Sequence, residues 1–136
     1  MSYQKRVFFR ESYDCQSGDK DSGSFQGKLI KANYVSQEYS FAFKVEDSLM
    51  RMQISYKNDC VEIVEEFSSA KSKMKLELNK QHDYAIELSN GYSLNFLLEA
   101  TEIVFDKDVI KLKYKLIDKV KKDTISLHEI RICGED

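Results

Sequence analysis

The sequence predicts an all-β fold, a single antiparallel β-barrel of roughly eight to ten strands. Apolar and polar side chains alternate with a period of two along most of the chain. Clusters of Gly, Asn, Asp, Ser and Lys separate these runs, and there is no proline. No helical stripe is sustained, even in the lysine-rich segment KLKYKLIDKVKK. Closure into a barrel would bury the apolar faces and remove the exposed edges of such strands.

The alternation begins weakly and becomes clear in the middle of the chain. KRVFFRESY at 5–13 and FQGKLIKANY at 25–34 are the first expected strands. YSFAFKV at 39–45 and LMRMQISY at 49–56 carry apolar residues at every second position, which is typical of half-buried strands. Later runs continue with inward-facing sets: Val61, Ile63 and Phe67; Met74, Leu76 and Leu78; Tyr84, Ile86 and Leu88; Tyr92, Leu94, Phe96 and Leu98; and Ile110, Leu112, Tyr114 and Leu116.

Two interruptions of this pattern predict bends. The inward set changes from even to odd numbers around Glu99–Thr101, and a similar switch is expected between Leu127 and Ile130. In LSNGYSLNF at 88–96, the pair Asn90–Gly91 predicts a two-residue type I′ hairpin turn. This hairpin would send Tyr92, Leu94 and Phe96 to the same side as Tyr84, Ile86 and Leu88.

Size, charge and cysteine content narrow the class of protein. A chain of 136 residues with 42% hydrophobic residues is expected to form one domain over residues 1–136. The net charge of -2 provides no overall attraction to nucleic acid or an anionic membrane. The first residues hold only three consecutive apolar side chains, so we expect no membrane segment and a cytoplasmic location. Three widely spaced cysteines without a CxxC pair predict reduced thiols, with no disulfide framework and no metal signature.

The second half of the chain is similar to a known family. SKMKLELNKQHDYAIEL, then NGYSLNF, then IKLKYKLID resemble the YwiB-like family of small bacterial proteins over about residues 60–132. The family's basic residue and glycine before the SKM-like segment, and its turn proline, are missing here. The resemblance implies a calycin-like, lipocalin-like barrel of unestablished biochemical function and no catalytic residues. Unlike fatty-acid carriers, the chain has no helical pair after its first strand, and Ile132 and Cys133 follow Arg131.

Inward-facing aromatic and methionine side chains are the candidates for ligand binding. Tyrosines and methionines could line a cavity for a flat or flexible apolar molecule. Packing into an ordinary core is the favoured alternative, because a small barrel can be filled by its own side chains. The candidate lining residues are Tyr39, Phe41, Met52, Tyr84, Phe96 and Tyr114, with His82 at the rim.

Residues that could support catalysis or bind nucleic acid form no recognisable motif. Catalysis by a cysteine paired with His82 or His128 would lack an orienting third group and a recognisable motif, so an ordinary barrel histidine is the favoured interpretation. Lysines at 71, 73 and 75 and at 111, 113 and 115 lie on outward faces, where acidic residues of neighbouring strands would balance them. We expect no catalytic residues, no metal site, no cofactor and no nucleic-acid partner.

The functional hypothesis is therefore a non-catalytic barrel that binds a small, largely apolar ligand in its interior, as a monomer or homodimer. The alternative is an interaction protein that binds a macromolecule through its outer sheet or an edge. A contiguous exposed apolar patch or an unbalanced lysine face would favour this alternative.

Overall fold

The fold is an all-β barrel, seen in a computed structural model. The structure describes the backbone of residues 5–15, 20–45, 47–67, 70–88, 90–106 and 109–134, and their side chains from residue 27 onward except at 45 and 134. Within these ranges the chain forms ten strands: β1 (Lys5–Cys15), β2 (Lys20–Asn33), β3 (Glu38–Val45), β4 (Ser48–Lys57), β5 (Cys60–Glu66), β6 (Ala70–Glu77), β7 (Gln81–Leu88), β8 (Ser93–Phe105), β9 (Val109–Ile117) and β10 (Thr124–Gly134).

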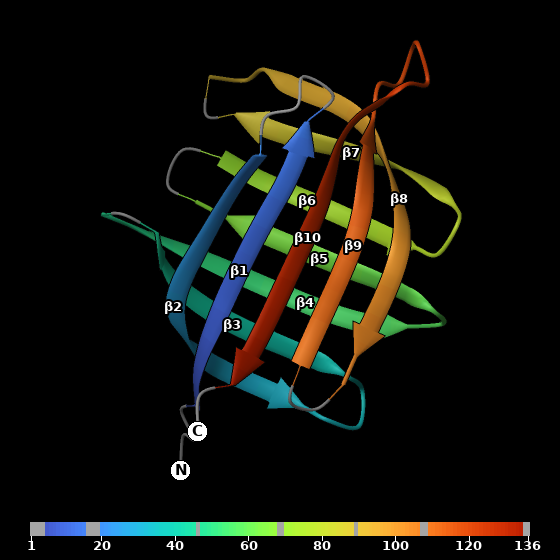
Figure 1. The fold of residues 1–136 in the computed structure, drawn as a ribbon. Helices are drawn as coiled ribbons and strands as arrows, with labels where there is room; N and C mark the ends of the chain where they lie inside the picture. Colours follow the sequence, from blue (N-terminus) through green and yellow to red (C-terminus); the bar gives the residue numbers. More distant parts are fainter. Residues whose placement is uncertain are drawn as a thin grey trace.

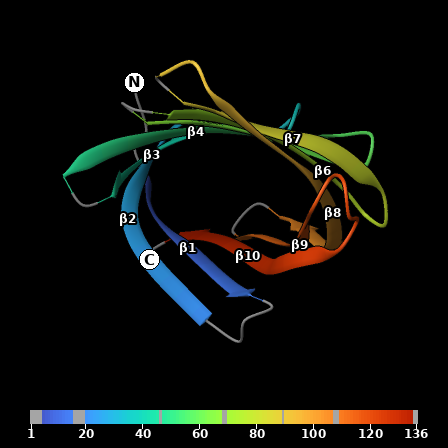
Figure 2. The same ribbon diagram turned by 90° about the horizontal axis from the view of Figure 1, so that it is seen from above.

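The strands close into one antiparallel barrel in sequence order. Each strand pairs with the next along the chain, and β1 also pairs with β10 to complete the ring. In Figure 1, β1, β9 and β10 cross in front of the sheet formed by β3 to β7. The view from above shows β2 and β8 passing from one layer to the other (Figure 2). The predicted all-β, single-barrel fold is confirmed.

Bulges occur in both strands that connect the two layers. The register of β2 shifts between Leu29 and Lys31, and that of β8 shifts between Ala100 and Glu102. A bulge bends its strand and increases the local twist, which lets a long strand turn a barrel corner. The bend predicted around Glu99–Thr101 is confirmed.

The second predicted bend is wrong. The register of β10 shifts earlier, between Thr124 and Ser126, and from Ser126 onward the pairing with β9 is regular. Leu127 therefore faces outward, where it is 49% exposed, and Ser126 and His128 face inward with Ile130. The apolar side chain of Leu127 indicates an inward position, which the regular pairing of β10 with β9 excludes.

Two hairpins show how the turn residues set the register. A two-residue type I′ turn lies between β4 and β5, where Asn58 and Asp59 have φ of 54° and 62°. The prediction of this turn at Asn90–Gly91 is wrong, because only Gly91 has positive φ there. Leu88 pairs with Tyr92 instead, and the N–H of Gly91 donates to the carbonyl of Leu88. This longer loop keeps even-numbered residues of β7 and β8 on one face.

The core lies along the inner face of the barrel. Alternate residues of β3, β4, β5, β6, β8, β9 and β10 meet there, and Phe43, Met52 and Leu112 are fully buried. Another buried pair lies on the outer face, where Leu97 of β8 is the register partner of Ile117 of β9. Among the described residues, no helix is long and apolar enough to cross a membrane.

Candidate functional site

Three of the predicted lining residues lie together on β3 and β4. The ring of Tyr39 stacks on that of Phe41, with centroids 6.3 Å apart, and Phe41 is the register partner of Met52. All three are buried. Burial raises the pKa of the Tyr39 hydroxyl, and the nearby Tyr34 and Asp106 raise it further. This group forms one end of the core.

An aromatic contact across the barrel fills this end. Phe105, at the end of β8, packs against Tyr39 of β3 with ring centroids 5.6 Å apart and stacks on Tyr56 of β4 at 5.2 Å. β8 is not a neighbour of β3 or β4 in the sheet, so these contacts join opposite walls. Side chains therefore meet across the interior at the end lined by Tyr39, Tyr56 and Phe105, which we call the aromatic end.

Tyr84 and Phe96 lie elsewhere on the inner face. They are register partners on β7 and β8, with ring centroids 6.4 Å apart, and both remain partly exposed. Beyond them, Tyr92 is 72% exposed and Leu94 is 48% exposed, although the register keeps Leu94 on the predicted face opposite Ile86. Leu97 is the first residue of β8 with a partner in β9, and the hairpin therefore extends past the end of β9.

A polar pair lies on the inner face of β10. In the sheet, β9 separates β10 from β8. The Oγ of Ser126 is 2.6 Å from the Nε2 of His128, and Ser126 is buried. The imidazole of His128 stacks on the ring of Tyr114 with centroids 5.0 Å apart and an interplanar angle of 7°. Burial lowers the pKa of His128, so the neutral imidazole is favoured. Tyr114, a predicted lining residue, is thus placed beside a hydrogen-bonding centre.

This polar pair was not predicted, because the apolar Leu127 between its members indicated the opposite face of β10. The alternation of Ser126, His128, Ile130 and Ile132 was the available signal. Alternation along the strand also indicates a second inward polar pair. Glu65 continues the inward positions of Val61 and Ile63 on β5, and its register partner on β6 is Ser72. The inner wall therefore combines a mostly apolar surface with a few polar groups.

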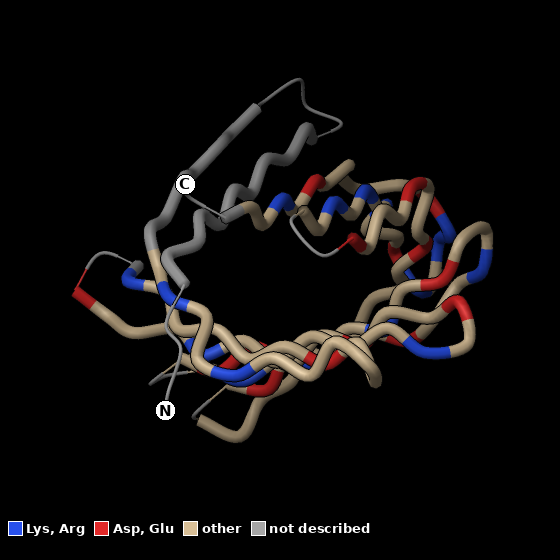
Figure 3. Tube along the Cα trace, turned by 90° about the horizontal axis from the view of Figure 1, so that it is seen from below, with Lys and Arg blue, Asp and Glu red and all other residues tan. Residues whose placement is uncertain are grey.

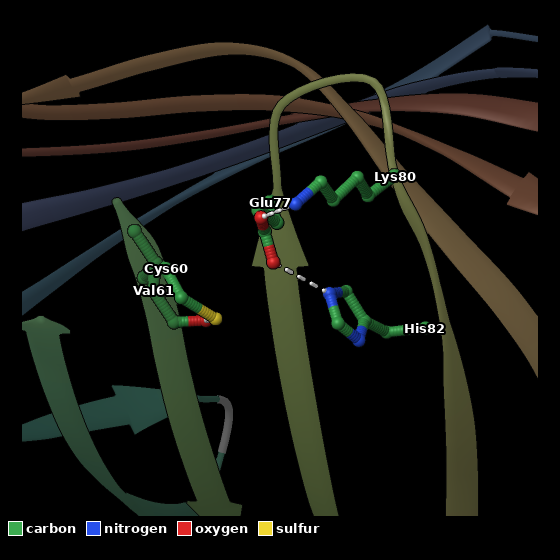
Figure 4. A network of polar contacts seen from close by, with 5 residues as sticks. All are labelled: Cys60, Val61, Glu77, Lys80 and His82. Carbon is green, nitrogen blue, oxygen red and sulfur yellow. Dashed lines mark hydrogen bonds and ion pairs between the residues drawn. The ribbon is translucent and has the colours of Figure 1, made fainter. Parts of the chain in front are cut away.

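His82 lies near the start of β7, and its side chain points toward Glu77 at the end of β6. Its Nε2 is 3.1 Å from Oε1 of Glu77, and the other carboxylate oxygen of Glu77 is 2.8 Å from the Nζ of Lys80 (Figure 4). Hydrogen bonds from Lys80 and His82 lower the pKa of Glu77. The thiol of Cys60 lies on the other side of Glu77, and burial raises its pKa. No sequence pattern connects Cys60 with His82.

Basic and acidic residues are interspersed along the described part of the chain (Figure 3). The ammonium groups of Lys111 and Lys113 lie 3.6 and 3.4 Å from the carboxylate of Glu102, and that of Lys115 lies 3.9 Å from Glu99. The predicted neutralisation of this lysine row is confirmed. A hollow of about 340 Å³ on the outer face of β2 to β5 is lined by residues of both charges, among them Lys31, Glu38 and Glu62.

Comparison with known proteins identifies the fold. No family model and no curated protein matches the chain. The crystal structure of the ywiB protein from Bacillus subtilis superposes with a TM-score of 0.65, covering 98% of this chain and 94% of the other at 9% sequence identity. The chain has a ywiB-like fold. At this identity the similarity shows the architecture alone, and the resemblance seen in the sequence is confirmed at that level.

Proposed function

We propose that this ywiB-like barrel binds one small, largely apolar molecule in its interior, away from the aromatic end. The observation that carries the proposal is a difference in exposure along the inner face. Inward side chains such as Phe43 and Met52 are fully buried, whereas Tyr84, Phe96 and Leu116 face inward and stay partly exposed. A bound apolar molecule would cover those three side chains.

The strand number supports an interior site. Eight strands enclose a space that side chains can fill or that holds one small ligand, and the diameter grows with each added strand. This barrel has ten strands in its described part. Side chains from opposite walls meet at the aromatic end, so the proposed ligand lies toward Tyr84, Phe96 and Tyr114.

The polar pair of β10 would orient the ligand. Small-molecule sites combine an apolar lining with a few placed polar groups. Ser126 and His128 supply a hydroxyl and a neutral imidazole beside the ring of Tyr114. A ligand with one hydroxyl, carbonyl or carboxyl group on an apolar body matches this arrangement. The predicted residues Tyr84, Phe96 and Tyr114 are retained as lining, whereas Tyr39, Phe41 and Met52 belong to the packed side of the core.

Binding without conversion is the activity we propose. A separation of 2.6 Å between a serine oxygen and a histidine nitrogen also suits a nucleophile and its base. Acyl transfer would further need N–H donors for the oxyanion. From Ser126 onward β10 pairs with β1 on one side and β9 on the other, and its N–H groups serve those ladders. We place the protein in the cytoplasm, where the free thiols of Cys60 and Cys133 would stay reduced.

Native mass spectrometry of the purified protein tests the proposal. We expect a monomer that carries a bound small molecule, which denaturation releases. In a stripped sample, the fluorescent probe 1-anilinonaphthalene-8-sulfonate should bind saturably at one site per chain. The change Ser126→Ala should weaken this binding about fivefold, because one hydrogen bond contributes about 1 kcal/mol. The outward Ser40→Ala is the control. A bare monomer without saturable probe binding, or a ligand-free dimer, would contradict the proposal.

A further inference from the structure

Three potential metal ligands converge where β6 and β7 separate. Cys60 of β5 and Glu77 of β6 are register partners, and His82 lies on β7. The sulfur of Cys60, a carboxylate oxygen of Glu77 and a ring nitrogen of His82 all lie within 4.8 Å of one another. Figure 4 shows the imidazole and the thiol pointing toward Glu77 from opposite sides.

The separation of the two strands makes this convergence possible. β6 and β7 are paired only between Ala70–Lys73 and Ala85–Leu88. Beyond that point the connecting turn is attached to β8, since the N–H of Asn79 donates to the carbonyl of Ala100 at 3.0 Å. Asn79 adopts a φ of 60°, which asparagine tolerates better than most residues. The two strands therefore diverge at this end, and the side chain of His82 points toward Glu77 (Figure 4).

We propose that Cys60, Glu77 and His82 bind one divalent transition-metal ion, zinc foremost. Thiolate, imidazole and carboxylate are the three ligand types of protein zinc sites. A thiolate excludes magnesium and calcium as the preferred ions, because both take oxygen ligands. Three protein ligands leave a fourth tetrahedral position for water or an added molecule, as in zinc sites that keep an open position.

The distances suit a small ion. With metal–nitrogen and metal–oxygen bonds of about 2.0–2.1 Å, neighbouring ligand atoms of a tetrahedral site lie about 3.3 Å apart. The Nε2 of His82 and Oε1 of Glu77 are 3.1 Å apart. Lys80 holds the second oxygen of Glu77 at 2.8 Å, which orients the carboxylate and leaves Oε1 for the ion. The side chains of His82 and Glu77 are 24% and 22% exposed, so ions can reach them from solution.

A simple polar network is the competing explanation for the cluster. Glu77, Lys80 and His82 form hydrogen bonds and ion pairs that need no metal. The thiol of Cys60 distinguishes the two explanations, because it takes no part in the network around the Glu77 carboxylate. Its sulfur donates a hydrogen bond to the carbonyl of Val61, at 4.0 Å. Metal binding requires the Cys60 thiolate as a ligand, whereas the polar network predicts that the thiol is irrelevant.

Titration of the reduced full-length protein with Co²⁺ tests the proposal, followed by competition with Zn²⁺. We expect one Co²⁺ per chain, a thiolate-to-cobalt charge-transfer band in the near ultraviolet, visible bands typical of tetrahedral cobalt, and displacement by Zn²⁺. Cys60→Ser should abolish the charge-transfer band, and His82→Gln and Glu77→Gln should each weaken binding tenfold or more.

Matched controls come from groups outside the cluster. Cys133→Ser removes the other described thiol, and Glu87→Gln removes an exposed carboxylate at the far end of β7. Both should bind Co²⁺ as the unaltered protein does, and circular dichroism should show all variants folded. If Cys60→Ser fails to fold, alkylation of native protein with and without Zn²⁺ replaces it, and Zn²⁺ should protect Cys60. Absence of the charge-transfer band, its persistence in Cys60→Ser or its loss in Cys133→Ser would overturn the proposal.

Discussion

Phe105 of β8 stacks on Tyr56 of β4 across the barrel, with ring centroids 5.2 Å apart and an interplanar angle of 18°. The two strands are far apart in the order of the sheet, so this contact stabilises the closed form rather than one hairpin. Both rings pack against the main core. The aromatic end therefore depends on a contact between residues that are distant in sequence.

Removal of the Phe105 ring should destabilise the whole barrel. Phe105→Ala is expected to lower the free energy of unfolding by about 2–3 kcal/mol, somewhat less than for a fully buried phenylalanine, because the ring is partly exposed. Urea unfolding followed by circular dichroism measures this change. The neighbouring outward residue gives the control, and Val104→Ala should change stability by less than about 0.5–1 kcal/mol. Equal effects of the two changes would contradict a cross-barrel role.

The strands were predictable because alternation is a local property of the sequence. β3, β4 and β9 show it most clearly, and the corner in β8 could be located because the apolar set changes parity there. The contact of Phe105 with Tyr56 on the opposite wall could not be predicted, because it depends on the cross-sectional shape of the closed barrel. Tyr92 and Leu94 are exposed because β9 ends opposite Leu97, before it reaches them. No residue near position 92 indicates where β9 ends.

The polar sites were less predictable than the fold. Ser126 and His128 follow the inward parity of β10, but an apolar Leu127 between them obscured it. The meeting of Cys60 with His82 depends on the separation of β6 from β7, and this separation arises from the attachment of Asn79 to β8. Such a tertiary contact produces no periodic pattern of residues in the sequence.

Gly27 should be intolerant of any side chain. A Cβ at this position of β2 would overlap the ring of Phe43 and the carbonyl oxygen of Ala42 on β3. Overpacking of this kind costs about 1–3 kcal/mol, and Gly27→Ala is expected to reach the upper part of that range because backbone is involved.

Gly91 gives an informative comparison, because its Cβ would meet no atom within 4 Å while its φ is 89°. Gly91→Ala should therefore cost about 1–2 kcal/mol through backbone strain alone. Thermal unfolding of both variants measures the effects. A Gly27→Ala protein as stable as the unaltered one would contradict the close approach of β2 to β3.

The carboxylate of Glu102 offsets part of the positive charge of the outer lysine row. The Glu102 carboxylate forms ion pairs with the ammonium groups of Lys111 and Lys113 on β9. Because these groups are partly exposed, Glu102→Gln should change the free energy of unfolding by less than about 1 kcal/mol. The same change should raise the salt concentration at which the protein elutes from immobilised heparin, a polyanion. Glu38→Gln, which removes an equal charge from β3, is the control, and a larger heparin shift for that variant would contradict the assignment.

The burial of His128 should make stability fall in mild acid. Burial lowers its pKa in the folded protein below the ordinary value of 6.5, so the folded state keeps the imidazole neutral. As the pH falls through about 6.5, the unfolded chain takes up a proton that the folded chain does not. The free energy of unfolding therefore decreases, by up to about 1.4 kcal/mol per pH unit, until the folded pKa is reached. The unaltered protein and His128→Asn share every other titratable group. The difference between their pH dependences therefore isolates the contribution of His128. Urea unfolding at pH 7.5 and pH 5.5 should show a larger loss for the unaltered protein, and equal losses in the two proteins would contradict a buried neutral His128.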